Sequence, residues 1–430
     1  MGITHRVFAI SLAALTNVPA IPSYAESSNL VELEERVAEL EATAARASAN
    51  KATVTIYGQV NRAILAWDDG RQQDAYVVDN DVSSTRLGAV GGVRIGGDWT
   101  AGYRLEIELR DAGSDTVNQA SDEGEGESAM ATRIAAWYVE SASKGRLTVG
   151  QQSPASDDIT LINLGASMSD AGIHYNNAFG LRLKSGPITD LTWESLVHTV
   201  DTYRGDFVRY DTPLMGGFLV SAAWGENDVW DAAVRHRGAF AGVQFASGLG
   251  YMQNDELNFA DVRGSASAIH GETGMFISAA AGARDEEKNS FTIANVGDFK
   301  IGEDSYFYFL QSGLSKHWLP LGKTSIYGEY GLYNNFSSGS VLRADFGAGL
   351  RDVGILLDNE VTRWGFGVEQ SIDASATLLY ANVNYFSADS TYCPAPWRGC
   401  AAGLPNAPTK NQKLPVEDWS GVVLGARIQF

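Results

Sequence analysis

The sequence predicts an all-β protein, an antiparallel up-and-down transmembrane β-barrel preceded by a short α-helical coiled coil. Apolar and polar residues alternate in many short segments of the 430-residue chain after position 53, as in strands with one face in lipid and the other in water. Short turns and long polar loops separate these segments in alternation. Trp and Tyr stand near the segment ends, where membrane–water boundaries favour them.

The first 25 residues have the features of a cleavable export signal. His5 and Arg6 precede the apolar stretch 7–15, and Ser23-Tyr24-Ala25 forms a small-x-small cleavage pattern. The apolar stretch is much shorter than the roughly 20 residues with which a helix spans a bilayer. We therefore expect residues 1–25 to be a signal peptide, with the mature chain starting at Glu26.

Residues 26–52 follow a helical period and form the second predicted segment. The positions that stand alternately three and four residues apart are Leu30, Leu33, Val37, Leu40, Ala44 and Ala47. This spacing predicts the apolar seam of a coiled coil. A coil this short is marginal alone, so we expect it to form in the periplasm where several chains are held together. A single amphipathic helix lying on its own barrel, or fraying, is the alternative.

Residues 53–430 form the predicted barrel domain. The clearest strand is 103–110, whose odd positions are apolar and whose even positions are Arg104, Glu106, Glu108 and Arg110. A large soluble sandwich or β-helix would leave such charged faces only open solvent, so we favour the barrel. Counting the alternating segments gives 18 strands, an even number as in bacterial outer-membrane barrels.

The connections between segments fall into two classes. Short turns are predicted at 96–98, 143–145, 185–187, 213–217, 237–238, 271–274, 320–322 and 372–373. Long polar loops are predicted at 67–84, 112–129, 153–177, 285–304, 335–360 and 388–418. Short turns at one rim and long loops at the other are typical of outer-membrane barrels.

Charge, cysteines and motifs exclude several function classes. The net charge of −20 argues against a nucleic-acid partner, because phosphates are bound by clustered Lys and Arg. Cys393 and Cys400 form a close pair in an exported chain, which predicts a disulfide rather than a metal site. The six His are scattered and no catalytic or phosphate-binding motif occurs. We expect no enzymatic activity, no cofactor and no metal.

Six stretches carry a resemblance to a known family. They are VTIYGQVNRAIL (54–65), STRLGAVG (84–91), LTVGQQ (147–152), 208–236, 364–386 and the terminal strand that ends at Phe430. In this order they resemble the Gram-negative general porins, in particular proteobacterial porins with an N-terminal coiled coil. The resemblance covers nearly all of 53–430.

The resemblance implies an outer-membrane homotrimer. Each barrel would hold a water-filled channel for passive diffusion of small hydrophilic solutes and ions, narrowed by a third loop that folds inward. Such porins usually have 16 strands, two fewer than the segment count. The hairpin at 179–199 can instead belong to the constriction region, which would restore 16.

The third loop, about 153–177, is the predicted constriction. It carries Asp157, Asp158 and Asp170 and has no Lys or Arg. Folded into the lumen, these carboxylates would face basic wall residues of the inward parity, namely Arg86, Arg94, Arg104, Arg110, Arg146, Arg182, Lys184 and Arg209. Opposed acidic and basic rows create a transverse field that favours polar solutes. The sequence does not fix the side on which Arg62 and Arg133 lie.

The terminal strand, 419–430, is predicted to close the barrel against 54–65. Its residues Val422, Leu424, Ala426 and Ile428 would then face membrane lipid, and Phe430 would lie in the aromatic boundary belt. Such a terminal aromatic resembles the signal that the barrel-assembly machinery reads.

Two alternatives to a general diffusion porin stay open. One is a channel selective for a single class of solute. The other is a structural envelope tether, in which the coiled coil binds peptidoglycan and the barrel only anchors it in the membrane.

Overall fold

The computed structural model describes residues 53–109, 111–124, 130–200, 204–255, 258–286, 290–293, 297–300, 304–347, 349–394 and 412–430. The predicted signal peptide and coiled coil, at residues 1–52, lie outside the described residues, so both stay predictions. In the part of the chain that the structure describes, no helix is long and apolar enough to cross a membrane.

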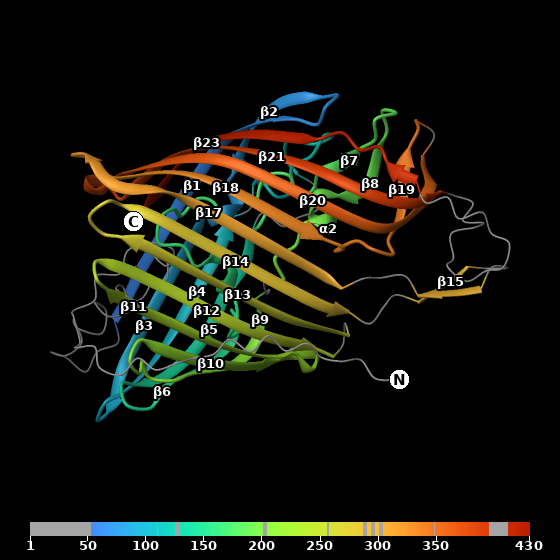
Figure 1. Cartoon of the computed structure of the whole chain (residues 1–430). Helices are drawn as coiled ribbons and strands as arrows, with labels where there is room; N and C mark the ends of the chain where they lie inside the picture. The colour runs from blue at the N-terminus through green and yellow to red at the C-terminus, as the bar shows by residue number, and fades with distance from the viewer. Residues whose placement is uncertain are drawn as a thin grey trace.

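The described residues form a closed antiparallel barrel of 16 strands. The smaller predicted strand number is therefore confirmed, and the count of 18 is wrong. Figure 1 shows the long tilted strands that make up the wall. They are β1 (Thr53–Asp68), β3 (Arg86–Gly96), β4 (Trp99–Leu109), β5 (Met130–Ser141), β6 (Gly145–Gln152), β9 (Gly205–Asp211), β10 (Phe218–Gly225), β11 (Trp230–Phe240), β12 (Val243–Asn254), β13 (Phe259–His270), β14 (Met275–Glu286), β17 (Ser305–Leu319), β18 (Gly322–Asn334), β20 (Leu350–Ile372), β21 (Thr377–Pro394) and β23 (Trp419–Gln429).

Five further strands within the described ranges join the same sheet from the long-loop rim. They are β2 (Gln73–Asp79), β7 (Gly180–Arg182), β8 (Ile188–Thr192), β19 (Val341–Asp345) and β22 (Gln412–Leu414). A separate ribbon pairs β15 (Ser290–Ile293) with β16 (Gly297–Lys300).

The wall has an apolar outer face and a polar inner face. On β4, Leu105 is 49% exposed whereas its neighbour Glu106 is 1% exposed. On β23, Val422, Leu424 and Ile428 are exposed in the same way. A strand turns successive side chains to opposite faces, so the alternation predicted for both strands is confirmed.

The first and last strands close the barrel. β1 and β23 pair antiparallel from Gln59↔Gln429 to Asp68↔Ser420. Gly58 and Phe430 add two backbone hydrogen bonds, with N···O distances of 2.9 and 3.0 Å. The predicted pairing of the terminal strand with 54–65 is thus confirmed, and the sheet has no open edge at this seam.

The two surplus strands of the sequence count belong to a loop inside the barrel. β6 pairs directly with β9, so residues 153–204, here called L3, form one long connection. The hairpin of β7 and β8, followed by α2 (Trp193–Leu196), lies within L3. L3 is therefore longer than the predicted 153–177, and the predicted turn at 185–187 joins β7 to β8 instead of two wall strands.

One short turn lies four residues beyond its predicted position. Arg237-Gly238 belongs to β11, which continues to Phe240, and the turn to β12 is made by Ala241 and Gly242. Both turn residues have positive φ, 50° and 81°, as a two-residue hairpin turn whose twist matches its strands requires. Ala rarely adopts this conformation. The sequence therefore favoured a turn at Gly238 over one that begins with Ala241.

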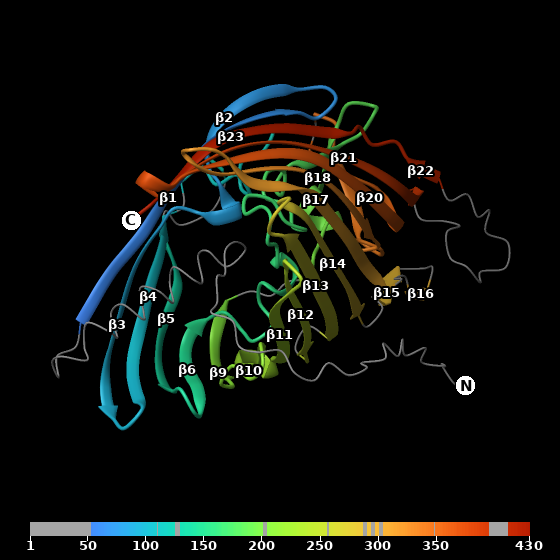
Figure 2. The ribbon, with the colours of Figure 1, turned by 60° about the vertical axis from the view of Figure 1, so that its left-hand side comes forward.

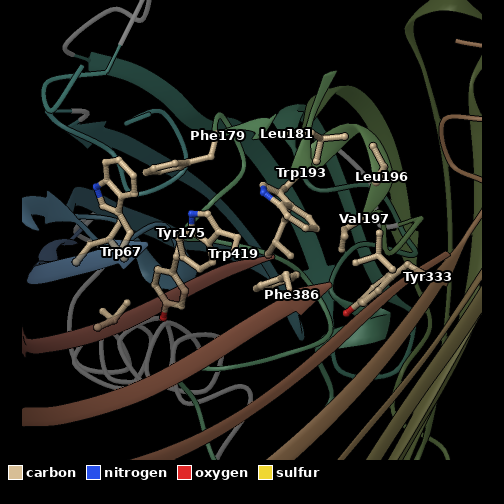
Figure 3. Packing of buried hydrophobic residues seen from close by; sticks show 14 of the residues in the cluster. Trp67, Tyr175, Phe179, Leu181, Trp193, Leu196, Val197, Tyr333, Phe386 and Trp419 are labelled. Atoms are coloured by element: carbon tan, nitrogen blue, oxygen red, sulfur yellow. The ribbon is translucent and has the colours of Figure 1, made fainter. Parts of the chain in front are cut away.

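An aromatic cluster fills the barrel interior on one side, where L3 meets β1, β21 and β23. Trp67, Phe179 and Trp419 contact in series, with ring centroids 4.9 and 5.7 Å apart. Trp193 of α2 meets Phe386 of β21 at 5.8 Å. Figure 3 shows these rings converging from wall and loop. The second half of L3 is therefore docked as a small hydrophobic core within the barrel.

Replacing Phe179 with Ala should loosen L3 without unfolding the barrel. The lost ring contacts cost about 3–5 kcal/mol, as for other buried Phe-to-Ala changes, and that loss falls on the docking of L3. We expect noisier and larger single-channel currents in planar bilayers. Val77→Ala, at a residue that is 68% exposed on β2, is the control; equal current noise in both variants would contradict the docking role.

Candidate functional site

L3 begins against β11, where buried polar side chains hold its backbone. Asp231 accepts hydrogen bonds from the backbone N–H groups of Ala155 (3.0 Å) and Ser156 (2.5 Å). Arg235, on the same face of β11, donates to the carbonyl oxygens of Ala155 (2.8 Å) and Asp157 (2.5 Å). Backbone donors and acceptors are thus both paired with the wall, which fixes the start of L3 there.

The middle of L3 is held in the same way by β18 and β20. Glu369 accepts from the backbone N–H groups of Ser167 (2.9 Å) and Met168 (2.7 Å). Arg363 donates to two carbonyl oxygens of L3 and pairs with Glu329 of β18 at 2.5 Å. The pairing with Glu329 fixes the guanidinium group on the wall, so its hydrogen bonds hold the backbone of L3 at a defined position.

Between these two anchors, L3 covers the inner face of β14 and β17. The side-chain amide of Asn163 donates to Gln311 (2.6 Å), and its oxygen accepts from Ser278 (2.9 Å). Ser278 is buried, and it also shares a hydrogen bond with Ser267 of β13 (2.7 Å). Figure 2 shows L3 inside the barrel, close to β13 and β14. L3 therefore follows the wall from β11 to β20.

A charged cluster occupies the inner face of β3, β4 and β5. It consists of Arg86, Arg104, Glu106, Glu108 and Arg133, and we call it the charged wall. The carboxylate of Glu106 forms ion pairs with three guanidinium groups: Arg104 at 2.9 Å, Arg133 at 2.8 Å and Arg86 at 3.6 Å. Arg133 also reaches Glu108 at 3.2 Å. Three guanidinium groups against two carboxylates leave this cluster with a net positive charge.

The hydroxyl of Tyr57, on β1, completes the charged wall. It donates to Glu106 (2.8 Å) and accepts from the Nε of Arg104 (2.8 Å). Charge-assisted bonds to fixed partners restrict the movement of long arginine side chains. The arginines therefore present their charge from defined positions.

A histidine joins L3 to the first loop. Nδ1 of His174 lies 3.0 Å from Asp81 of η2 (Asp81–Ser83), and Nε2 lies 3.0 Å from Asp170 of L3. The imidazole therefore bridges two carboxylates, which we call the His174 latch. Burial lowers the pKa of His174, but the two carboxylates outweigh burial and raise it from 6.5 to about 10. Burial raises the pKa of each carboxyl, and the imidazolium in turn holds both below their ordinary value.

These pKa shifts define the pH range of the latch. The raised pKa of His174 adds stability that is fully present below its ordinary pKa and is lost as pH rises through about 10. The lowered pKa values of Asp81 and Asp170 add stability that is lost when acid protonates them. The latch is therefore charged and intact from mildly acidic solution to about pH 9.

The three predicted acids of L3 have different surroundings. Asp157 is buried, with Arg204 at 3.8 Å. Asp158 is exposed, with a left-handed backbone (φ 59°) just before η3 (Ile159–Leu161). Asp170 is held in the His174 latch. L3 does not present them as one row, and their role in the constriction stays a prediction.

The predicted bases separate into four groups. Arg86 and Arg104 belong to the charged wall. Arg94 and Arg146 lie toward the short-turn rim, where Arg146 stacks over Tyr138 at 3.7 Å. Arg209 pairs with Asp211 at 2.9 Å and donates to the carbonyl oxygen of Pro154 (3.1 Å). Arg182 and Lys184 form the fourth group, which is not part of the wall.

Arg182 and Lys184 belong to the β7–β8 hairpin inside L3. Arg182 pairs with Asp69 of the first loop at 2.8 Å, and Lys184 is exposed beside it. Their predicted position on the barrel wall is therefore corrected, because the hairpin repeats the alternation of a wall strand but folds into the interior. Arg110 lies outside the described residues.

Sequence reasoning left Arg133 unplaced because of a β-bulge. Glu106 pairs with Ile134 and Ile107 with Thr132, so Arg133 is the extra residue on β5. A bulge interrupts the two-residue period, and no residue type in this segment marks it. Sequence reasoning also missed Arg235, Arg363 and His174. The alternation of polar and apolar residues on β11 and β20 could have placed the two arginines on the inner face.

Two further predictions concern cysteines and metals. Cys393 is buried near the end of β21, whereas Cys400 lies outside the described residues, so their disulfide stays a prediction. Within the ranges that the structure describes, no group of three or more His, Cys, Asp and Glu is arranged to hold a metal ion.

Comparisons with known proteins give consistent results. A family model described as Gram-negative porin matches residues 37–391. An anion-selective porin from Comamonas acidovorans matches with a TM-score of 0.53 and 15% identity, covering 88% of this chain and all of that chain. Outer-membrane expressed OmpT of Vibrio cholerae matches with a TM-score of 0.51 and 15% identity, over 89% of this chain and 99% of that one. A trimer form of OmpT matches with a TM-score of 0.51, 16% identity and coverage of 88% and 99%. No match is found among curated protein sequences.

His174→Gln should shift the channel toward cations. The variant removes one positive charge from L3 and leaves Asp81 and Asp170 without their cation. In a salt gradient across a planar bilayer, the reversal potential should move in the cation-selective direction. Wild type should keep its reversal potential up to about pH 9 and move toward the variant as His174 deprotonates.

The control for this change is His317→Gln, at an exposed histidine near the short-turn rim of β17. It should leave the reversal potential unchanged at neutral pH. A His174→Gln channel with the wild-type reversal potential would show that the latch does not face the ion path.

Proposed function

The chain belongs to the family of Gram-negative porins, and from that premise we propose that ions and small hydrophilic solutes diffuse through its barrel between L3 and the charged wall. The supporting observation is that L3 is fixed to one side of the barrel interior, along the inner faces of β11 to β20. The charged wall lies on β3 to β5, beyond that run of anchors. The proposal contains no catalytic step, in keeping with a family of channels.

The charges on the two sides of this path differ. L3 contributes the exposed Asp158 together with His174 and Asp170 of the His174 latch, and the first loop contributes the second carboxylate of the latch, Asp81. The charged wall has a net positive charge. A carboxylate-rich surface facing guanidinium groups produces a field across the path, which orders water and favours polar solutes over apolar ones.

Ion preference should follow this local field rather than the net charge of −20. Charges on the outer surface are screened within about 10 Å at moderate salt, so they contribute little to the field across the path. Arginines fixed by Glu106 act at the path itself. Passage should not saturate, because no tight binding step is involved; saturable block by one solute would favour the solute-selective alternative.

Glu106→Gln tests the proposed path. The change removes the carboxylate that three guanidinium groups surround, so the charged wall gains positive charge. Single-channel recordings in a salt gradient should show the reversal potential moving in the anion-selective direction. Glu360→Gln, at an exposed outward position on β20, is the matched control and should have no effect. Equal behaviour of the two variants, or correctly folded protein without channels, would refute the proposal.

We further infer that the chain assembles as a homotrimer in the outer membrane, as family membership supports. The relevant relative is the trimer form of OmpT from Vibrio cholerae, which shares the fold. Unboiled protein extracted in mild detergent should migrate as a trimer on a gel and collapse to a monomer on boiling. The tether alternative depends on the coiled coil, outside the described residues, and deletion of residues 27–50 tests it through attachment to peptidoglycan.

Deleting Phe430 should lower the yield of folded barrel more than it changes channel conductance. Phe430 is 66% exposed at the seam, where the assembly machinery can reach it, and it lies outside the ion path. The yield is measured as the heat-modifiable fraction on a gel. Ile428→Ala, which keeps the terminal aromatic, is the control; equal yields of the two variants would contradict an assembly role for Phe430.

A further inference from the structure

A shallow apolar groove runs along the outer face of the barrel, on the side formed by β12, β13, β14 and β17. Figure 1 shows these strands side by side. The groove has a volume of about 700 Å³, within the range of ligand-sized pockets. Its lining is almost entirely apolar and includes Leu249, Gly264, Ala281 and Tyr308.

The strand register explains the groove. Leu249 pairs with Gly264, Gly264 with Ala281, and Ala281 with Tyr308. These four residues form one row across four strands, in which two large side chains flank two very small ones. Neighbouring strands are about 4.8 Å apart, so the row leaves a floor two strands wide between its walls.

In the next row on the side of the long loops, only the residue beside the tyrosine is very small, because Val262 takes the place of Gly264. Val262 pairs with Ala283, and Ala283 with Tyr306. The rings of Tyr306 and Tyr308 lie 5.6 Å apart along the same wall. The groove therefore extends along the strands and is bordered by two tyrosines near the start of β17, at the long-loop rim.

We propose that this groove seats an acyl chain of a lipid in the outer leaflet. Its position supports this occupant, because the groove continues the exposed apolar face that contacts the membrane. The long loops of such barrels are extracellular, so the half of the strands that carries the groove faces the outer leaflet. The tyrosines stand toward the boundary, where a phenol hydroxyl meets the polar part of a lipid.

Packing, rather than removal of apolar surface from water, drives this binding. Lipid tails are as apolar as the protein wall, so a chain gains little by leaving other lipids. A groove left incompletely filled loses dispersion contacts along its whole floor. A straight chain restores these contacts, so the lipid in the groove should exchange more slowly than lipids on the rest of the wall.

The test uses the full chain, purified as its assembled oligomer and delipidated in detergent. Lipid A, the acylated anchor of the outer leaflet, is the probe, and native mass spectrometry measures its binding. Ala281→Phe fills the floor of the groove. Ala222→Phe, at an exposed outward position on β10, adds the same side chain elsewhere on the wall.

Wild type and Ala222→Phe should bind lipid A alike, and Ala281→Phe should bind it about tenfold more weakly, because several packed carbons lose their contacts. Tyr308→Ala removes one wall without adding bulk, so it should fold and also bind lipid A more weakly. Equal binding by Ala281→Phe and Ala222→Phe would overturn the proposal. So would loss of the oligomer in Ala281→Phe alone, because the groove would then be a contact between subunits.

Channel conductance separates this proposal from the proposed function. The groove is on the outside of the barrel, so Ala281→Phe and Tyr308→Ala should conduct like wild type. Weaker lipid binding together with normal conductance supports the groove as a lipid site. Absence of conductance in all variants and in wild type would refute the channel, while the lipid-binding result would still decide the groove.

Discussion

A sheet in lipid has no water to satisfy its backbone N–H and C=O groups, so its hydrogen-bond ladder must close on itself. The pairing of β1 with β23 provides this closure, and the rest of the structure depends on it. Closure gives each wall strand one face toward lipid and one toward the interior. It also creates the enclosed space in which a connection between neighbouring strands β6 and β9 can lie without meeting the membrane.

L3 lies in that space and is fixed to the inner face of the wall. The buried carboxylates of Asp231 and Glu369 accept its N–H groups, and the half-buried Arg235 and the buried Arg363 donate to its carbonyl oxygens. The aromatic cluster around Trp419 packs its second half. Releasing L3 would leave the carboxylates of Asp231 and Glu369 without these donors, at a cost of about 1–3 kcal/mol or more for each. The narrow section therefore has two firm sides, and fixed charges rather than a moving gate shape the proposed path.

Much of the wall was predictable because the two-residue period is imposed by the backbone. It placed Arg104 and Glu106 on the inner face of β4 and Val422 and Leu424 on the outer face of β23. It failed where tertiary structure alters a local pattern. The bulge at Arg133 shifts the period, the hairpin of Arg182 imitates a wall strand, and a carboxylate such as Asp231 that binds a distant backbone leaves no local signal.

The central claim, that ions pass between L3 and the charged wall, is tested most directly by thiol accessibility in open channels. Arg104→Cys places a thiol on the charged wall, and Ser278→Cys places one behind L3, where Asn163 covers it. A charged, membrane-impermeant methanethiosulfonate reagent should reduce the single-channel current of Arg104→Cys and leave Ser278→Cys and wild type unchanged. Current loss in Ser278→Cys with none in Arg104→Cys would contradict the account.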